Sequence, residues 1–183
     1  MKKLISVLSL SALLLASCSK SSSPTSNNNN NNNAGANQVV ATVGSTAITF
    51  KTLAHSGGSY TQIAGISSLS FAIAGTDSAT GSTLTIGGGG FVGTGTYDIG
   101  LEHGHGTTSD YAFALDYTKK GSGSGSTEYR SDANNSVKVG TIDITSVSAT
   151  GAQGTFSATL PQINPSGTSN TVAITNGSFN VTF

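Results

Sequence analysis

Apolar side chains recur at every second position through most of the chain after residue 37. Leu69, Phe71 and Ile73, for example, are separated by Ser70 and Ala72. This period places one face of a segment against a core and the other in water, as in a half-buried β-strand. No later window of a dozen residues has the 3.6-residue period of a helix, so the sequence predicts an all-β fold. The same alternation is present in segments 84–86, 97–101, 111–117, 142–144, 156–160, 172–174 and 179–183.

Turn signals divide these segments into short strands. Asn176-Gly177 is the strongest short signal of a β-hairpin, with Gly177 expected to supply a positive φ, and Gly44-Ser45 predicts a second tight turn. About ten strands joined in this way predict an antiparallel β-sandwich, with a small antiparallel β-barrel as the alternative. Loops are expected at residues 75–81, 87–90, 119–127 and 161–169.

The first 17 residues have the layout of a secretory signal peptide. Lys2 and Lys3 precede an apolar run that is too short to span a membrane. Leu15-Ala16-Ser17-Cys18 resembles the lipobox of bacterial lipoproteins, and Cys18 is the single cysteine of the chain. This resemblance implies cleavage between Ser17 and Cys18, a diacylglycerol on the Cys18 sulfur, and a fatty acid such as palmitate on the new amino terminus.

Residues 18–37 predict a disordered tether between the lipid and the rest of the chain. The stretch KSSSPTSNNNNNNNAGAN, from Lys20 to Asn37, lacks the apolar side chains that would offset its ordering entropy. A flexible chain of about 20 residues spans roughly 25 Å on average. Residues 38–183 are then expected to form one domain.

The residues after the cysteine bear on the location of the protein. Ser19, and not an aspartate, follows Cys18. By resemblance to Gram-negative lipoproteins, this favours the outer membrane. Whether the domain faces the periplasm or the cell surface stays open at this point.

Charged residues are scarce in this sequence. They make up 9% of the chain, against about 25% in ordinary globular domains. The chain has 8 basic and 8 acidic residues, so removing Lys2 and Lys3 leaves 6 against 8 and a net charge of −2. Because no basic stripe runs along the sequence, we expect neither nucleic-acid binding nor electrostatic binding to a membrane.

Few residues are candidates for chemistry. His103 and His105 lie two positions apart and would share one face of a strand, so they are a weak candidate metal site. A catalytic zinc site needs a third protein ligand, and nothing in the sequence places His55 beside this pair. Solvated histidines at a loop end are the commoner arrangement. Tyr117 and Tyr129 flank a long loop and are weak candidates for a sugar-binding platform.

The sequence offers no set of catalytic residues, and we expect neither an enzyme nor a cofactor. GSGSG at residues 121–125 has the letters of a nucleophile elbow, but it lies in a Gly/Ser loop with no following helix. The eight acidic residues are scattered, so no pair stands out for glycoside hydrolysis.

Several stretches resemble, in order, a family of small Gram-negative lipoproteins of unknown function. The resemblance is carried by GTFSATL at 154–160 and VAITNGSFNVTF at 172–183. It extends more loosely to GTYDIG at 95–100, YRS at 129–131 and VGTIDITSVSATG at 139–151. The family has no assigned activity, so the resemblance implies no catalytic residues.

Together these features predict a lipid-anchored envelope protein that acts as a non-enzymatic binding or structural module. Its expected partners are the membrane, through Cys18, and a glycan or another envelope protein. Two alternatives stay open: a surface glycan-binding or adhesin module, and a weakly supported metal-dependent hydrolase.

Overall fold

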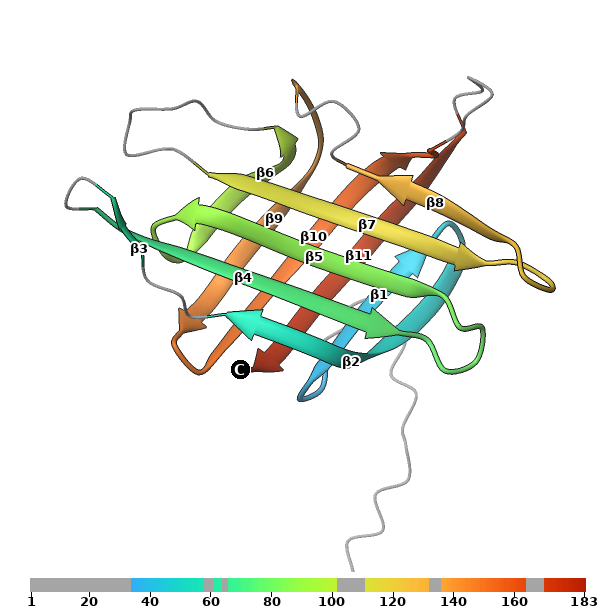
Figure 1. Ribbon diagram of the computed structural model, residues 1–183, viewed down its shortest axis with the longest axis horizontal. Coiled ribbons are helices and arrows are strands. Elements are labelled where there is room, and N and C mark those ends of the chain that lie inside the picture. The colour runs from blue at the N-terminus through green and yellow to red at the C-terminus, as the bar shows by residue number, and fades with distance from the viewer. Residues whose placement is uncertain (1–33, 58–60, 64–65, 102–110, 132–135, 164–169) are drawn as a thin grey trace, which may run out of the picture.

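The part of the chain that the structure describes contains eleven β-strands (Figure 1). The computed structural model describes residues 34–57, 61–63, 66–101, 111–131, 136–163 and 170–183. Within these ranges no helix is long and apolar enough to cross a membrane. The all-β prediction is confirmed, with one strand more than the approximate count. The strands are β1 (Gln38–Val43), β2 (Thr46–Gly57), β3 (Thr61–Ile63), β4 (Ile66–Thr76), β5 (Thr83–Phe91), β6 (Gly95–Leu101), β7 (Ala112–Lys120), β8 (Ser126–Arg130), β9 (Ser136–Ser148), β10 (Gly151–Pro161) and β11 (Thr171–Thr182).

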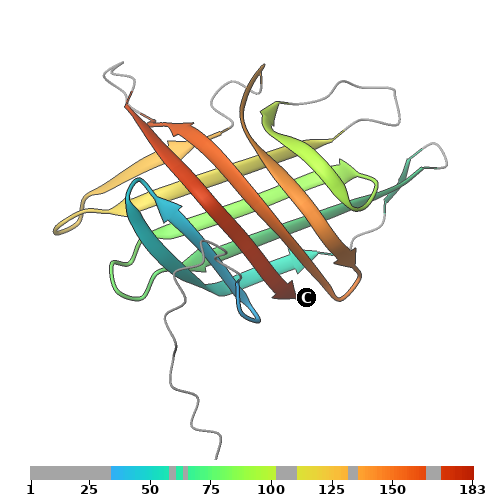
Figure 2. The ribbon, with the colours of Figure 1, turned by 180° about the vertical axis from the view of Figure 1, so that it is seen from behind.

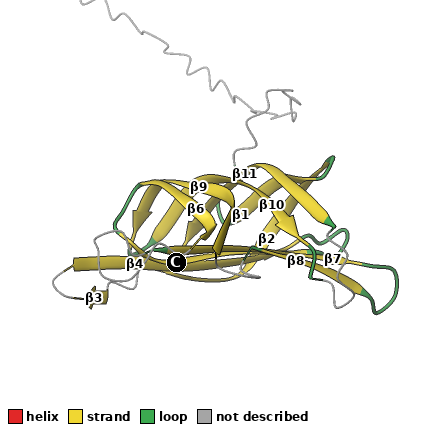
Figure 3. Cartoon of the chain, turned by 90° about the horizontal axis from the view of Figure 1, so that it is seen from above, coloured by secondary structure: helices red, strands yellow, loops and turns green. Residues whose placement is uncertain are grey.

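The strands are arranged in two layers packed face to face (Figures 1 and 3). One layer contains β1, β11, β10, β9 and β6, and Figure 2 shows it from its outer side. The other layer contains β4, β5, β7 and β8. Neighbouring strands within each layer are antiparallel, as the predicted β-sandwich requires. Pairing also continues between the layers at both edges, as in a flattened barrel.

Strand β2 joins the layers at one edge because it changes partner along its length. Residues 46–51 pair with β1, and residues 51–57 pair with β4. Lys51 is the residue where the change occurs, since it lies opposite Gln38 on one side and Thr76 on the other. The predicted turn before β2 is confirmed: Gly44 has a φ of 62°, which the first position of a type II′ turn requires.

The other edge is closed by β6, β7 and β8. Strands β6 and β7 are parallel and meet at one pair, Ile99 with Phe113, a pairing that the predicted antiparallel pattern did not include. Further along β7, the same edge pairs with β8, from Asp116 opposite Arg130 to Lys120 opposite Ser126. Strand β8 was not predicted because its five residues, STEYR, contain one apolar side chain.

The core lies between the two layers, and the period of two identified most of it. In β7, Phe113, Leu115 and Tyr117 are at most 3% exposed, while the residues between them face outward. Aromatic rings fill the middle of the core, where Phe71 and Phe91 lie with centroids 5.9 and 5.1 Å from that of Phe113. The alternating pattern therefore predicted most of the strands, β3 and β8 excepted, and the faces that those strands bury.

Asn176 and Gly177 lie inside β11, so the predicted hairpin is wrong. Strand β11 runs through both residues and pairs with β10 on one side and β1 on the other. Both pairings shift register here, and Asn176 takes a φ of 50°, which together define a β-bulge. Gly177 is needed for a different reason: a Cβ there would lie 2.6 Å from the ring of Phe156.

This bulge yields a prediction about residue 176. The left-handed conformation costs a residue with a Cβ roughly 1–2 kcal/mol, and most when the side chain is β-branched. Asn176→Val is therefore expected to lower the free energy of unfolding by about that amount. Asn176→Gly, the matched control, should leave it unchanged or slightly raised. Urea unfolding followed by circular dichroism measures both, and equal effects of valine and glycine would contradict the assigned conformation.

Residues 87–90 also lie in a strand and not in the predicted loop. They belong to β5, where Gly87, Gly88 and Gly89 pair with both β4 and β7. Gly88 faces the core, and a Cβ there would overlap the ring of Phe113. The glycine in this strand makes room for an aromatic ring on the neighbouring strand.

Candidate functional site

The chain joins the folded domain at a fixed point on β11. The main-chain N–H of Ala34 donates to the Ser178 hydroxyl at 2.9 Å, and that of Thr182 donates to Asn37 Oδ1 at 2.9 Å. Ser178 lies on the opposite side of β11 from the buried Phe179, yet it is only 6% exposed. Residues 34–37 are thus held against the outer face of β11 before β1 begins, and we call this contact the tether junction.

Charged side chains of β7 and β8, and of β6 and β9, form ion pairs at the surface, where Asp98 is the least exposed partner. Arg130 lies 3.8 Å from both Asp116 and Glu128, and Lys138 lies 2.6 Å from Asp98. Exposed pairs of this kind contribute little to stability. Within these pairs, positive and negative charges do offset each other. The charge of the remaining surface therefore depends on the charged side chains outside these pairs.

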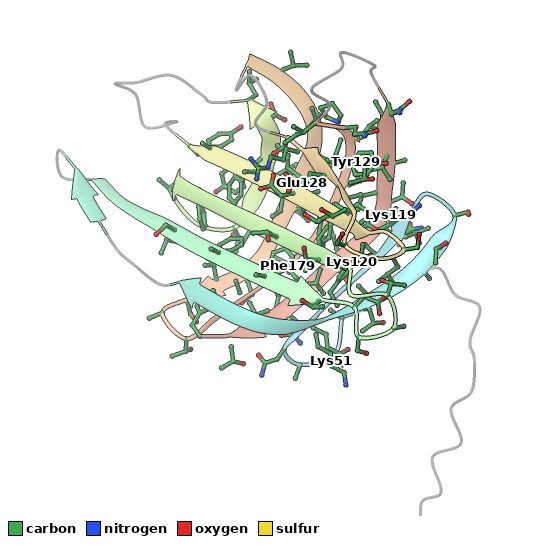
Figure 4. The ribbon with its side chains drawn as sticks, turned by 45° about the vertical axis from the view of Figure 1, so that its right-hand side comes forward. Lys51, Lys119, Lys120, Glu128, Tyr129 and Phe179 are labelled. Carbon is green, nitrogen blue, oxygen red and sulfur yellow. The ribbon has the colours of Figure 1, made fainter. Side chains whose placement is uncertain are left out.

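Three lysines make no ion pair with any residue in the described ranges. Lys51 lies on β2, and Lys119 and Lys120 end β7 (Figure 4). All three are exposed. Among the residues that the structure describes, these lysines on two strands thus contribute positive charge that no carboxylate pairs with.

Tyr117 and Tyr129 are brought together by strand pairing. They lie opposite each other on β7 and β8, and their rings stack with centroids 6.0 Å apart and planes 26° apart. Tyr117 is 3% exposed and also packs edge-to-face against Phe50. The ring of Tyr117 therefore offers no open face to a ligand. Tyr129 is half-buried, and a contribution from it to ligand binding stays a prediction.

Ser131 is a buried polar residue that the sequence did not single out. Its N–H donates to the Leu115 carbonyl at 3.0 Å, and its hydroxyl accepts from the Leu115 N–H at 2.8 Å. The residue is 4% exposed. Because both bonds go to the main chain of β7, Ser131 holds the chain after β8 against β7, and its hydroxyl has a structural role. In the YRS segment, Tyr129 thus stacks on Tyr117, Arg130 forms ion pairs, and Ser131 makes buried hydrogen bonds.

Most of the other predicted site residues lie outside the described ranges. This applies to Ser17, Cys18, His103 and His105. The main chain of His55 is described, and it places this residue on β2 opposite Ile73. In the part of the chain that the structure describes, no three metal-ligating side chains gather.

In the described part of the chain, the pKa values of Asp77 and Tyr97 are shifted, and the causes are local. The Thr80 hydroxyl, 2.6 Å from Asp77, and the Ala79 N–H lower the pKa of the Asp77 carboxyl, which organises the turn between β4 and β5. Burial raises the pKa of Tyr97, whose hydroxyl donates to the Gly93 carbonyl at 2.8 Å. Both groups stabilise loops, so neither shift indicates a reaction centre.

Aromatic side chains are nearly absent from the described surface. The large apolar side chains that are exposed there are Val92, Val137 and Ile163. Tyr111, Tyr129 and Phe183 are partly buried and pack against the core. Among the residues described, no exposed ring forms the flat platform on which sugars usually stack.

Comparisons of the chain with protein-family models, curated proteins and solved structures find no match. The fold and the side chains above define an all-β sandwich domain with a fixed tether junction. Function must be inferred from this geometry and from the N-terminal sequence.

Proposed function

We propose that the protein is a lipoprotein of the outer membrane, anchored by lipid on Cys18, whose β-domain is a non-enzymatic binding or structural module. The observation that carries this proposal is the tether junction. The polar chain that follows Cys18 ends where Ala34 and Asn37 are hydrogen-bonded to β11. A domain attached at one fixed point is suited to being held at a membrane by a flexible tether.

The hydrogen bonds of the polar side chains favour a binding or structural module and not an enzyme. Asp77 and Thr80 bond within their own turn, Ser82 accepts from the Lys120 N–H at 3.1 Å, and Ser131 bonds to β7. These groups hold strands and turns together. A ligand of this domain would contact a surface of hydroxyl, amide and main-chain groups. Of the two tyrosines predicted to bind a sugar, Tyr129 is the one whose ring is partly exposed.

The N-terminal part of the proposal rests on Leu15–Cys18 and on membrane energetics. Each buried methylene of an acyl chain contributes about 0.8 kcal/mol, and one chain alone gives only reversible binding. Three chains on one terminus would therefore anchor the protein stably. The resemblance of GTFSATL and VAITNGSFNVTF to small Gram-negative lipoproteins supports the same proposal.

Replacing Cys18 tests the anchor. We expect the wild-type protein to incorporate an alkyne-labelled fatty acid, to lack residues 1–17 by mass spectrometry, and to partition with membranes. Cys18→Ala should abolish the label and the cleavage, because the thioether cannot form. Ser21→Ala, a change in the tether beside the lipobox, is the matched control and should behave as wild type. An unmodified Cys18 in native protein, or intact residues 1–17, would overturn the proposal.

The non-enzymatic part has its own test. The purified domain is expected to release no product from a panel of ester, amide, phosphoester and glycoside substrates. Product released by the folded protein and lost on His103→Ala would favour the metal-dependent hydrolase instead.

A further inference from the structure

Strand register brings Lys51 to the same end of the molecule as the β7–β8 hairpin. Lys51 lies opposite Thr76 on β4, Thr76 lies opposite Thr83 on β5, and Thr83 lies opposite Thr118 on β7. These residues form one row across the sheet, at about 4.8 Å per strand. Lys119 and Lys120 follow Thr118 directly. Residues far apart in sequence thus present their charges at one end (Figure 4).

The local structure fixes where the two hairpin lysines lie. The Lys120 N–H donates to the Ser82 hydroxyl at 3.1 Å, which holds the end of β7 against the turn between β4 and β5. Across the hairpin, Lys119 lies opposite Thr127, and the Gly121 N–H donates to the Gly125 carbonyl at 2.9 Å. The hairpin that carries these lysines is closed by strand pairing and by this bond. We call Lys51, Lys119 and Lys120 the basic end.

The surrounding charges leave the basic end positive. Asp77 is the carboxylate of the neighbouring turn, and it is hydrogen-bonded to Thr80. Glu128 is opposite Thr118, but its carboxylate shares Arg130 with Asp116. Within the described ranges, three ammonium groups without an ion pair thus stand against one turn carboxylate and one carboxylate that Arg130 partly neutralises.

The tether reaches the domain beside this basic end. Gln38, the first residue of β1, lies directly opposite Lys51. Asn37, one residue earlier, belongs to the tether junction. Lys20, two residues after Cys18, adds another positive charge near the predicted lipid. The tether therefore reaches the domain at the end whose lysines make no ion pair with any described residue.

We infer that the basic end docks on anionic phospholipid headgroups of the leaflet that Cys18 anchors, which orients the domain on the membrane. This inference rests on the proposed lipid anchor. The chain as a whole lacks a basic stripe, which is why the sequence argued against electrostatic membrane contact. Folding reverses that expectation because it gathers lysines from separate strands.

The expected strength is modest, which suits a contact made by a tethered domain. A lysine near an anionic surface contributes roughly a fivefold change in equilibrium constant, and the effect falls off within a Debye length. Such a contact would not recruit a free protein. A short flexible tether raises the local concentration to the millimolar range, where a few lysines can decide the orientation.

A fluorescent probe at the hairpin measures this docking. The full lipidated chain with Ser122→Cys would carry one free thiol, since Cys18 bears the lipid, and the probe would be attached there. The protein would be placed in vesicles of phosphatidylcholine alone, or mixed with phosphatidylglycerol, each containing a headgroup-labelled quencher. We expect stronger quenching with phosphatidylglycerol, and loss of the difference at high salt.

Lysine variants assign the effect to the basic end. Changing Lys51, Lys119 and Lys120 together to glutamine should lower the equilibrium constant for docking by roughly fivefold for each lysine. Lys138→Gln is the matched control, because it removes one lysine that is already paired with Asp98, and it should leave quenching unchanged. Quenching that ignores phosphatidylglycerol, or that falls equally in the control, would overturn the inference. Failure of the lipid anchor itself is distinct, since the protein would then be absent from both kinds of vesicle.

Discussion

Phe113→Ala is expected to lower the free energy of unfolding by about 3–5 kcal/mol, the range for deleting a buried phenylalanine ring. The ring of Phe113 is 3% exposed and lies at the centre of the aromatic core. Its centroid is 5.1 Å from that of Phe91 and 5.2 Å from that of Tyr97, so its removal leaves a cavity lined by rigid rings. Urea unfolding of a chain expressed without residues 1–18, followed by circular dichroism, would give this value.

A second substitution, at Gly88, tests whether the Phe113 ring packs against β5 as described, which the loss of a large side chain alone does not test. In the wild-type protein, a Cβ at Gly88 would overlap the Phe113 ring, so Gly88→Ala should cost about 1–3 kcal/mol. In the Phe113→Ala background the ring is absent. There the same change should be neutral or stabilising, because alanine restricts the unfolded chain more than glycine does. A Gly88→Ala effect that is the same in both backgrounds would show that the two residues are not in contact.

The strands could be predicted from the sequence because each apolar face repeats over several residues. Phe113, Leu115 and Tyr117 show the period clearly, and all three are buried. The hairpin prediction at Asn176-Gly177 and the loop prediction at residues 87–90 both depended on glycine and failed, whereas the glycine turn at Gly44 was predicted correctly. A glycine can either permit a positive φ or let another group come close, and the sequence does not separate the two uses. At Gly88 and Gly177 the second use applies, since aromatic rings occupy the space of a side chain.

The candidate site was harder to predict because it depends on which strands become neighbours. Tyr117 and Tyr129 looked like two rings beside a loop, whereas the register places them against each other. The basic end arises in the same way, through a row of pairings from Lys51 to Thr118. Ser131 had no signal, because its role depends on the main chain of a strand sixteen residues away.

Gly154→Ala is expected to be the other strongly destabilising change, at about 3 kcal/mol, the upper part of the range for overpacking a core. A Cβ at this position would overlap the carbonyl oxygen of Asp143 and lie 2.6 Å from Cζ of Phe179. The carbonyl belongs to β9, which is paired on both sides by β10 and β6. Neither the strand nor the ring can move without disturbing its neighbours.

The comparison that makes this prediction specific is Gly87→Ala. Gly87 is also a strand glycine with neighbours on both sides, but its nearest atoms to an added Cβ are 3.7 and 3.9 Å away. Alanine there should be tolerated or stabilising by up to about 1 kcal/mol, because glycine inside a strand has an entropic cost. Gly154→Ala should cost less in a Phe179→Leu background than in the wild type but stay destabilising, since leucine removes the ring contact and leaves the carbonyl contact. No cost in that background would mean that the Phe179 ring alone requires glycine at position 154, and an unchanged cost would assign that requirement to the β9 main chain.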